Sequence, residues 1–209
     1  MTGGIMLRRK DGVTLIELLV TLVFSSILMA ASYRVFLGGQ KCYAVQEQVV
    51  DLQQNVRAAI DRMTREIRMA GYRKDILASV GNIGGFSKVI TPGNSVNNIG
   101  KNDDQITIIV ADKAITYKLQ WDPTDASMPV LIRKENGVSE VVADNIENLQ
   151  FRYTLRDGMV TDLPITPDNI RMVKISLTAR TKLADPQLSG DGYRRRSLSS
   201  LTEIRNMSS

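Results

Sequence analysis

The chain has 209 residues, with 27 lysines and arginines against 22 acidic residues, for a formal net charge of +5. This length allows one domain plus an N-terminal anchor, and the modest charge gives no reason to expect nucleic-acid binding. One cysteine and no histidine exclude an intrachain disulfide and any catalytic site built on an imidazole.

The N-terminus combines a short basic leader with a long apolar run. Arg8, Arg9 and Lys10 come first, and the residues from Leu18 to Tyr33 are predominantly apolar. This order is typical of membrane targeting, and the positive-inside rule keeps the leader in the cytoplasm. As a helix, the 21 residues from Val13 to Tyr33 would be about 31 Å long, enough to cross a bilayer.

Glu17 is the one charged residue between Val13 and Tyr33. A carboxylate at the centre of a bilayer costs roughly 2.5–3.5 kcal/mol on insertion scales, so its presence calls for an explanation. Two interpretations remain open. Glu17 either lies near the cytoplasmic interface of a plain single-pass anchor, or is paired with an opposite charge that makes its burial tolerable.

The order Gly12-Val13-Thr14-Leu15-Ile16-Glu17, followed by an apolar helix, resembles the class III signal of type IV pilins and pseudopilins. The resemblance implies that prepilin peptidase removes residues 1–12 by cutting after Gly12 and that the new N-terminus, Val13, is methylated. It also implies that Glu17 acts in filament assembly by pairing with the terminal amine of a neighbouring subunit. Val13 departs from the family, which usually has phenylalanine there.

A second helical segment is predicted after the membrane-spanning part, which we place at residues 13–37. Gly38-Gly39 predicts a bend or a locally melted turn, because each glycine costs up to about 1 kcal/mol inside a helix. Residues 38–72 then form an amphipathic helix that ends at Gly71. Its apolar stripe recurs every three or four residues and favours packing on a sheet over a coiled coil: Val45, Val49, Leu52, Val56, Ile60, Met63, Ile67 and Ala70.

The rest of the chain, residues 73–209, predicts a β-rich globular domain. Residues 73–104 are polar and glycine-rich, which indicates a long variable loop. Alternating patterns and turn signals then predict antiparallel strands, with a hairpin turn at Asn136-Gly137 and a short helical turn at 144–147. The strands are expected at 106–111, 114–121, 130–134, 138–142, 149–156, around 173–179 and at 197–204. The fold class is therefore α+β: a long N-terminal helix packed on an antiparallel sheet.

Three later stretches, at 61–72, 143–153 and 204–206, resemble PilW-like minor pilins and the related pseudopilin J. This resemblance implies a low-abundance subunit that is incorporated in a type IV pilus or primes its assembly. Its expected partners are prepilin peptidase, other minor and major pilin subunits, and the inner membrane. The domain would be periplasmic before it reaches the pilus at the cell surface. Two alternatives stay open, a type II secretion pseudopilin and a membrane-anchored binding domain that never polymerises.

Enzymatic and metal-binding functions have little support in the sequence. Cys42 has no histidine to activate it, and no glycine-rich phosphate loop is present. The loop carboxylates at 103–104 and 122–125 lack the spacing of a calcium loop, and the second pair favours a capped turn. We predict no catalytic residue, no metal site and no cofactor.

Overall fold

The computed structural model describes residues 12–94, 104–122, 124, 128–185 and 188–207, without the side chains of Lys41, Cys42 and Asn94. The chain divides into two compact units, Met1–Ala44 and Val45–Ser209. One long helix, α1 (Leu15–Arg68), begins in the first unit and ends in the second.

Helix α1 is continuous through Gly38-Gly39, so the melted turn predicted there is absent. Neither glycine has another atom within 4 Å of the position that a Cβ would take, so nothing in the described chain requires a glycine at either place. The regular hydrogen bonds of the surrounding turns hold both residues in the helix despite their low intrinsic propensity.

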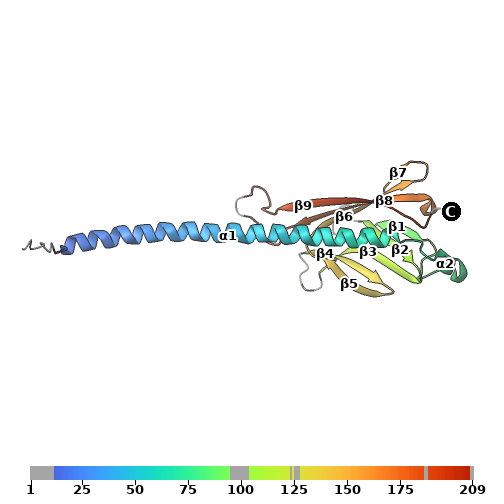
Figure 1. Cartoon of the computed structure of the whole chain (residues 1–209), viewed down its shortest axis with the longest axis horizontal. Coiled ribbons are helices and arrows are strands. Elements are labelled where there is room, and N and C mark those ends of the chain that lie inside the picture. The colour runs from blue at the N-terminus through green and yellow to red at the C-terminus, as the bar shows by residue number, and fades with distance from the viewer. Residues whose placement is uncertain (1–11, 95–103, 123, 125–127, 186–187, 208–209) are drawn as a thin grey trace, which may run out of the picture. The chain divides into compact units, whose positions relative to one another are not determined.

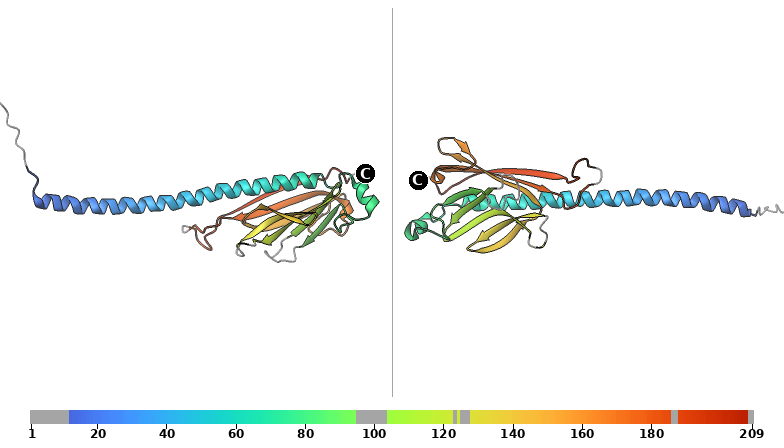
Figure 2. Two further views of the ribbon diagram at one scale, coloured as in Figure 1. Left: turned by 90° about the horizontal axis from the view of Figure 1, so that it is seen from below. Right: turned by 180° about the vertical axis from the view of Figure 1, so that it is seen from behind.

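The second unit contains two antiparallel sheets where the sequence predicted one (Figures 1 and 2). The five-stranded sheet has the order β1-β2-β3-β4-β5, and the four-stranded sheet has the order β7-β6-β8-β9. The strands are β1 (Ile90–Asn94), β2 (Asp104–Val110), β3 (Lys113–Trp121), β4 (Pro129–Glu135), β5 (Val138–Ala143), β6 (Ile146–Leu155), β7 (Val160–Thr161), β8 (Ile170–Arg180) and β9 (Arg195–Glu203).

The predicted hairpins are present with small shifts in their ends. Asn136 and Gly137 both have positive φ, 48° and 94°, as a tight turn between β4 and β5 requires. On β6 the alternation predicted from Phe151, Tyr153 and Leu155 is confirmed, since all three side chains are buried. The last strand, predicted at 197–204, begins at Arg195 and ends at Glu203.

Two local predictions were wrong. Residues 73–104 are not a continuous loop, because they include α2 (Lys74–Val80) and the edge strand β1. Residues 144–147 do not form a helical turn; Asp144 and Asn145 make a bend with Asn145 at φ 58°, and β6 begins at Ile146. At β1 and at the start of β6, the pairing of distant strands outweighs the local composition.

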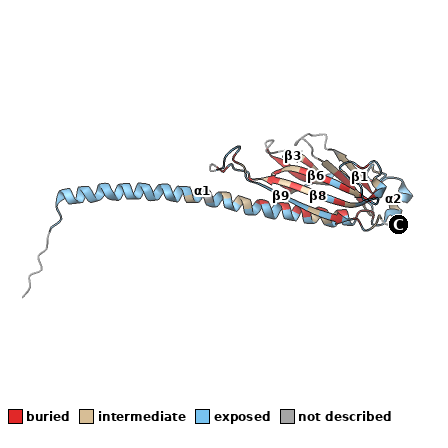
Figure 3. Ribbon diagram, turned by 90° about the horizontal axis from the view of Figure 1, so that it is seen from above, coloured by how far each residue is buried: buried red, intermediate tan, exposed pale blue. Residues whose placement is uncertain are grey.

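The core of the second unit lies between α1 and the sheets. Figure 3 shows the buried residues of this part of α1 on one face of the helix, and further buried residues along the strands on that side. The predicted stripe is confirmed from Leu52 to Ala70, while Val45 and Val49 are only partly buried. The stripe joins apolar residues of both sheets in one buried cluster, so it packs on sheets as expected.

Polar contacts also hold α1 against the five-stranded sheet. Glu66 accepts hydrogen bonds from Tyr117 Oη (2.7 Å) and from Arg133 Nε (3.0 Å). One turn earlier, Arg62 makes a two-pronged contact with Glu140 at 2.9 and 2.7 Å. These charge-assisted bonds tie α1 to β3, β4 and β5 at defined positions along the helix.

The end of α1 is fixed to the C-terminal segment. Gly71 has φ +77°, and its N–H donates to Ile109 O at 2.9 Å. Asn206 Nδ2 donates to Met69 O at 3.4 Å, and the same carbonyl also accepts the Tyr72 N–H at 2.9 Å. Gly71 was expected to end the helix, and the last helical residue is Arg68, within the same turn.

Candidate functional site

The predicted cleavage position lies immediately before α1. Gly12, Val13 and Thr14 have no regular secondary structure, and the Val13 side chain is 71 % exposed. A Cβ placed on Gly12 would meet no atom within 4 Å. The peptide bond between Gly12 and Val13 therefore lies in open, non-helical chain, as a bond must to enter a protease active site.

Thr14 forms the N-cap of α1. The Glu17 N–H donates to Thr14 Oγ1 at 3.3 Å, and the Leu18 N–H donates to Thr14 O at 3.1 Å. A threonine followed three residues later by glutamate is the capping-box pattern, which satisfies N–H groups that the first turn leaves open. We did not predict this role for Thr14, although the spacing Thr-x-x-Glu could have revealed it.

Glu17 lies in the first turn of α1, where the positive end of the helix dipole favours a carboxylate. Among the residues that the structure describes, no cation pairs with it. Its side chain is exposed, like those of its neighbours in the apolar run. The dipole contributes only about 0.3–1 kcal/mol, less than the cost of a charge at the bilayer centre. Within the described part of the chain, Glu17 therefore lacks a counter-charge strong enough to offset the cost of burying it in the bilayer.

The apolar run exposes a large surface on every side of the helix in the first unit. Leu15, Met29 and Val35 are each more than three-quarters exposed. Two polar side chains among them are satisfied locally, because Thr21 Oγ1 donates to Leu18 O and Ser26 Oγ donates to Val23 O. By length and composition α1 is able to cross a membrane. Its surface is suited to lipid or to the apolar helices of other subunits.

Among the residues that the structure describes, the other positions considered in the sequence do not form a chemical site. Asp104 accepts a hydrogen bond from the Phe151 N–H, and Asp122 caps its own turn by accepting from Thr124 N and Oγ1. Asp103, Asp125 and the Cys42 side chain lie outside the described residues. Within the described ranges, no group of three or more possible ligands is placed to hold a metal ion.

The basic run at 194–196 is largely engaged in ion pairs. Arg194 pairs with the buried Asp185 at 2.6 Å, and Arg195 pairs with Glu147 at 2.6 Å and with Asp191 at 2.5 Å. These contacts hold the loop between β8 and β9 in place.

Comparison with known families identifies the N-terminal segment. Residues 7–33 match the model of the prokaryotic N-terminal methylation motif. The match includes Gly12, Val13 and Glu17 and ends at Tyr33, where the apolar run ends. No curated protein matches the chain. The segment that the motif covers is therefore the one in which the structure places the open Gly12–Val13 bond, the Thr14 cap and the first turns of α1.

Proposed function

We propose that this chain, which carries a prepilin-type signal on a membrane-anchoring helix, is a minor pilin that is processed and then built into a type IV pilus. One observation carries the proposal: a lone carboxylate, Glu17, without a cation partner in the described chain, stands one turn after an open Gly12–Val13 bond. Proteins with this motif are structural subunits, and the exposed apolar surface of α1 is suited to assembly.

Processing would create the missing positive charge. Hydrolysis after Gly12 by prepilin peptidase leaves a carboxylate on Gly12 and a new amine on Val13. A methylated amine stays protonated near neutral pH, because its pKa is close to that of an ordinary amino terminus. In the membrane, this cation and the Glu17 carboxylate each need an opposite charge.

Pairing between neighbours would satisfy both charges and set the register of stacking. The Glu17 carboxylate of one subunit meets the Val13 amine of an adjacent subunit while the apolar helices pack side by side. Because both groups would be buried in the filament, a mismatched register would leave two unpaired charges in an apolar environment. The pair therefore favours one axial offset over all others.

The mass of the protein purified from its own cells tests the processing step. We expect the loss of residues 1–12 and the gain of one methyl group on Val13. A Gly12→Ala variant should keep its leader, although the added methyl group meets nothing in this chain, because the peptidase would no longer accept the position. A full-length wild-type protein would contradict the proposal.

Substitution of Glu17 tests assembly separately from processing. Glu17→Gln should be cleaved normally yet be absent from sheared filaments, because the amide cannot neutralise the Val13 amine. Glu47→Gln makes the same chemical change at an exposed position on the same helix and should assemble like the wild type. If Glu17→Gln entered filaments as well as the wild type, the protein would be better described as a membrane-tethered domain that does not polymerise.

The proposal places the domain in the periplasm before assembly and chooses a type IV pilus over a secretion pseudopilus, although residues 61–72, 143–153 and 204–206 resemble both PilW-like minor pilins and pseudopilin J. Deletion of the chain should then reduce the number of surface pili while leaving protein secretion intact. The opposite result, loss of secretion with normal piliation, would assign the chain to a type II secretion pseudopilus.

A further inference from the structure

The connection between β6 and β8 presents an unusual apolar projection. Residues 156–169 leave the four-stranded sheet, form the two-residue strand β7 and the short helix η1 (Pro167–Asn169), and return at Ile170. Figure 1 and the right-hand view of Figure 2 show this connection standing away from the body of the second unit. Its projecting part carries four large apolar side chains that are more than half exposed: Met159, Val160, Leu163 and Ile165.

Exposure on this scale is costly for a side chain without a partner. Ile165 is 97 % exposed, and covering a side chain of this kind contributes roughly 1.5–3 kcal/mol. Single exposed apolar residues are common, but four within seven positions form a patch of the kind that marks an interaction site.

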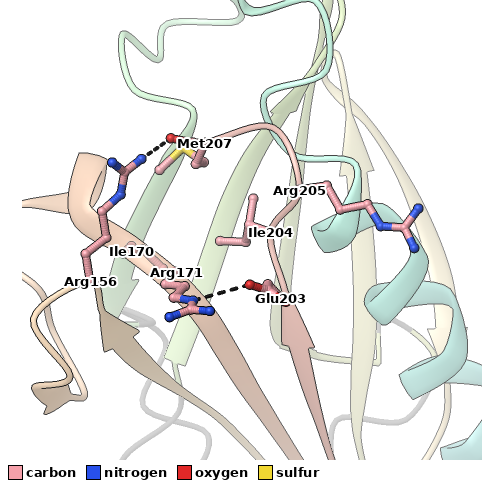
Figure 4. Close-up of a pocket in the computed structure, with 7 residues that line it drawn as sticks. All are labelled: Arg156, Ile170, Arg171, Glu203, Ile204, Arg205 and Met207. Atoms are coloured by element: carbon pink, nitrogen blue, oxygen red, sulfur yellow. Dashed lines mark hydrogen bonds and ion pairs between the residues drawn. The ribbon is translucent and has the colours of Figure 1, made fainter. Parts of the chain in front are cut away.

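A basic pocket adjoins the base of the same connection. The pocket has a volume of 530 Å³, and Figure 4 shows the side chains around it. The Arg156 N–H donates to Asn169 O at 2.9 Å, which closes the connection, and Arg156 and Ile170 both line the pocket. The base of the apolar projection therefore lies at the pocket.

The charges of the pocket favour an acidic group. Among the described residues, three arginines and one glutamate line it, so positive charge is in excess: Arg156, Arg171, Arg205 and Glu203. Arg171 uses only Nε, at 3.2 Å from Glu203, and both of its Nη groups lack partners among the described residues. Arg156 donates through Nη2 to Met207 O, and its other side-chain donors have no partner in the described part of the chain. A carboxylate accepts two parallel bonds from such a guanidinium.

We propose that this surface docks a segment of a second protein in which a carboxylate lies next to apolar side chains. The carboxylate would bind Arg171 and Arg156 while the apolar side chains cover Leu163 and Ile165. Ile170, Ile204 and Met207 also line the pocket and would desolvate the ion pair, which makes it stronger than at a flat surface. This inference holds whether or not the chain polymerises.

Photo-crosslinking in the native cell tests the proposal on the full chain. A photoreactive amino acid at Leu163 should give a discrete product with another protein, and the cross-linked peptide should contain Asp or Glu beside apolar residues. Arg171→Glu should reduce the yield about tenfold or more, which corresponds to at least about 1.4 kcal/mol. Replacing the acidic residue of the cross-linked partner segment with arginine should restore the cross-linking yield of Arg171→Glu.

Two further variants distinguish a loss of docking from a loss of folding. Lys174→Glu reverses a charge on the same strand outside the pocket and should leave the yield unchanged. Ile165→Ser removes an almost fully exposed side chain and should lower the yield while the thermal unfolding midpoint stays the same. Three outcomes would overturn the proposal. The first is that no cross-linked product forms, and the second is a product with lipid or with a second copy of this chain. The third is that Arg171→Glu leaves the yield unchanged.

Discussion

At the scale of single residues, the start of α1 depends on Thr14. Thr14→Ala removes the oxygen that accepts the Glu17 N–H and should cost about 1 kcal/mol of helix stability. Hydrogen exchange of the Glu17 amide, measured in detergent micelles, should accelerate accordingly. Thr14→Ser keeps the accepting oxygen and should exchange like the wild type. Equal protection in all three proteins would mean that the cap is not formed.

Two buried tyrosines of the second unit offer a matched comparison. Tyr117 Oη donates to the Glu66 carboxylate, whereas the Tyr153 hydroxyl is buried without a hydrogen-bond partner in the described structure. Burial and the neighbouring Glu66 raise the pKa of Tyr117 well above its ordinary value. Tyr117→Phe should lower the free energy of unfolding by about 1.5–3 kcal/mol, the range for a bond to a charged group. Tyr153→Phe should be neutral or stabilising, and urea denaturation measures both.

The ion pairs on α1 and β4 predict how stability changes with pH. The hydrogen bond from Arg62 lowers the pKa of Glu140, and those from Lys113 and Arg133 lower the pKa of Glu135. A carboxyl whose pKa is lowered in the folded state stabilises the protein above its unfolded pKa. That stability is lost as the pH falls through the folded value, below the ordinary 4.5.

Acid titration of the unfolding midpoint checks this sign. Glu140→Gln should flatten the decline of the thermal midpoint between pH 5 and pH 3 (roughly the range that follows from the ordinary carboxyl pKa). The flattening should be small, because the pair is exposed to solvent. A decline as steep as that of the wild type would show that Glu140 does not contribute.

At the scale of elements, the sequence correctly predicts those helices and turns that are determined by local sequence patterns. The stripe from Leu52 to Ala70 repeats with the helical period, and Asn136-Gly137 is a strong turn signal, so α1 and the β4–β5 hairpin were placed correctly. Strand β1 contains Pro92 and Gly93, and it forms only because β2 pairs with it from Asp104 to Ile108. The division into two sheets depends likewise on which distant strands meet, and no local pattern encodes that choice.

The glycine pair in α1 provides a test at this scale. Gly38→Ala and Gly39→Ala should each stabilise the helix locally by roughly 0.5–1 kcal/mol, because alanine loses less backbone entropy and meets no neighbour. Hydrogen exchange of the amides near residues 38–42 should slow in the double variant. If the exchange rates were unchanged, local opening of the helix at the two glycines would not control exchange in this segment. If local melting accompanies assembly, the double variant should also enter filaments less efficiently.

At the scale of the whole molecule, the candidate site was easier to predict than the surfaces around the globular unit. Gly12, Val13 and Glu17 stand in one short motif, so a linear pattern reveals them together. The docking surface combines Leu163 and Ile165 with Arg171 and Met207, which only the return of the chain at β8 and β9 brings together. A linear pattern does not record such a juxtaposition.

The distribution of buried residues predicts that the second unit folds by itself. Every member of the buried apolar cluster found among the described residues lies between Leu52 and Ile204. A fragment that starts at Val45, the first residue of the unit, keeps all of them and lacks the exposed apolar run. This fragment should be soluble without detergent and should unfold in one cooperative transition, monitored by circular dichroism.

A shorter fragment that starts at Ala58 provides the contrast. It lacks Leu52 and Val56, whose burial contributes roughly 1.5–3 kcal/mol each, so its free energy of unfolding should fall by about 3–6 kcal/mol. For a domain of ordinary marginal stability this is a large part of the total. If both fragments unfolded alike, the first turns of α1 in this unit would contribute nothing to the core. If neither folded, the membrane-anchoring part of α1 would be needed for the stability of the sheets.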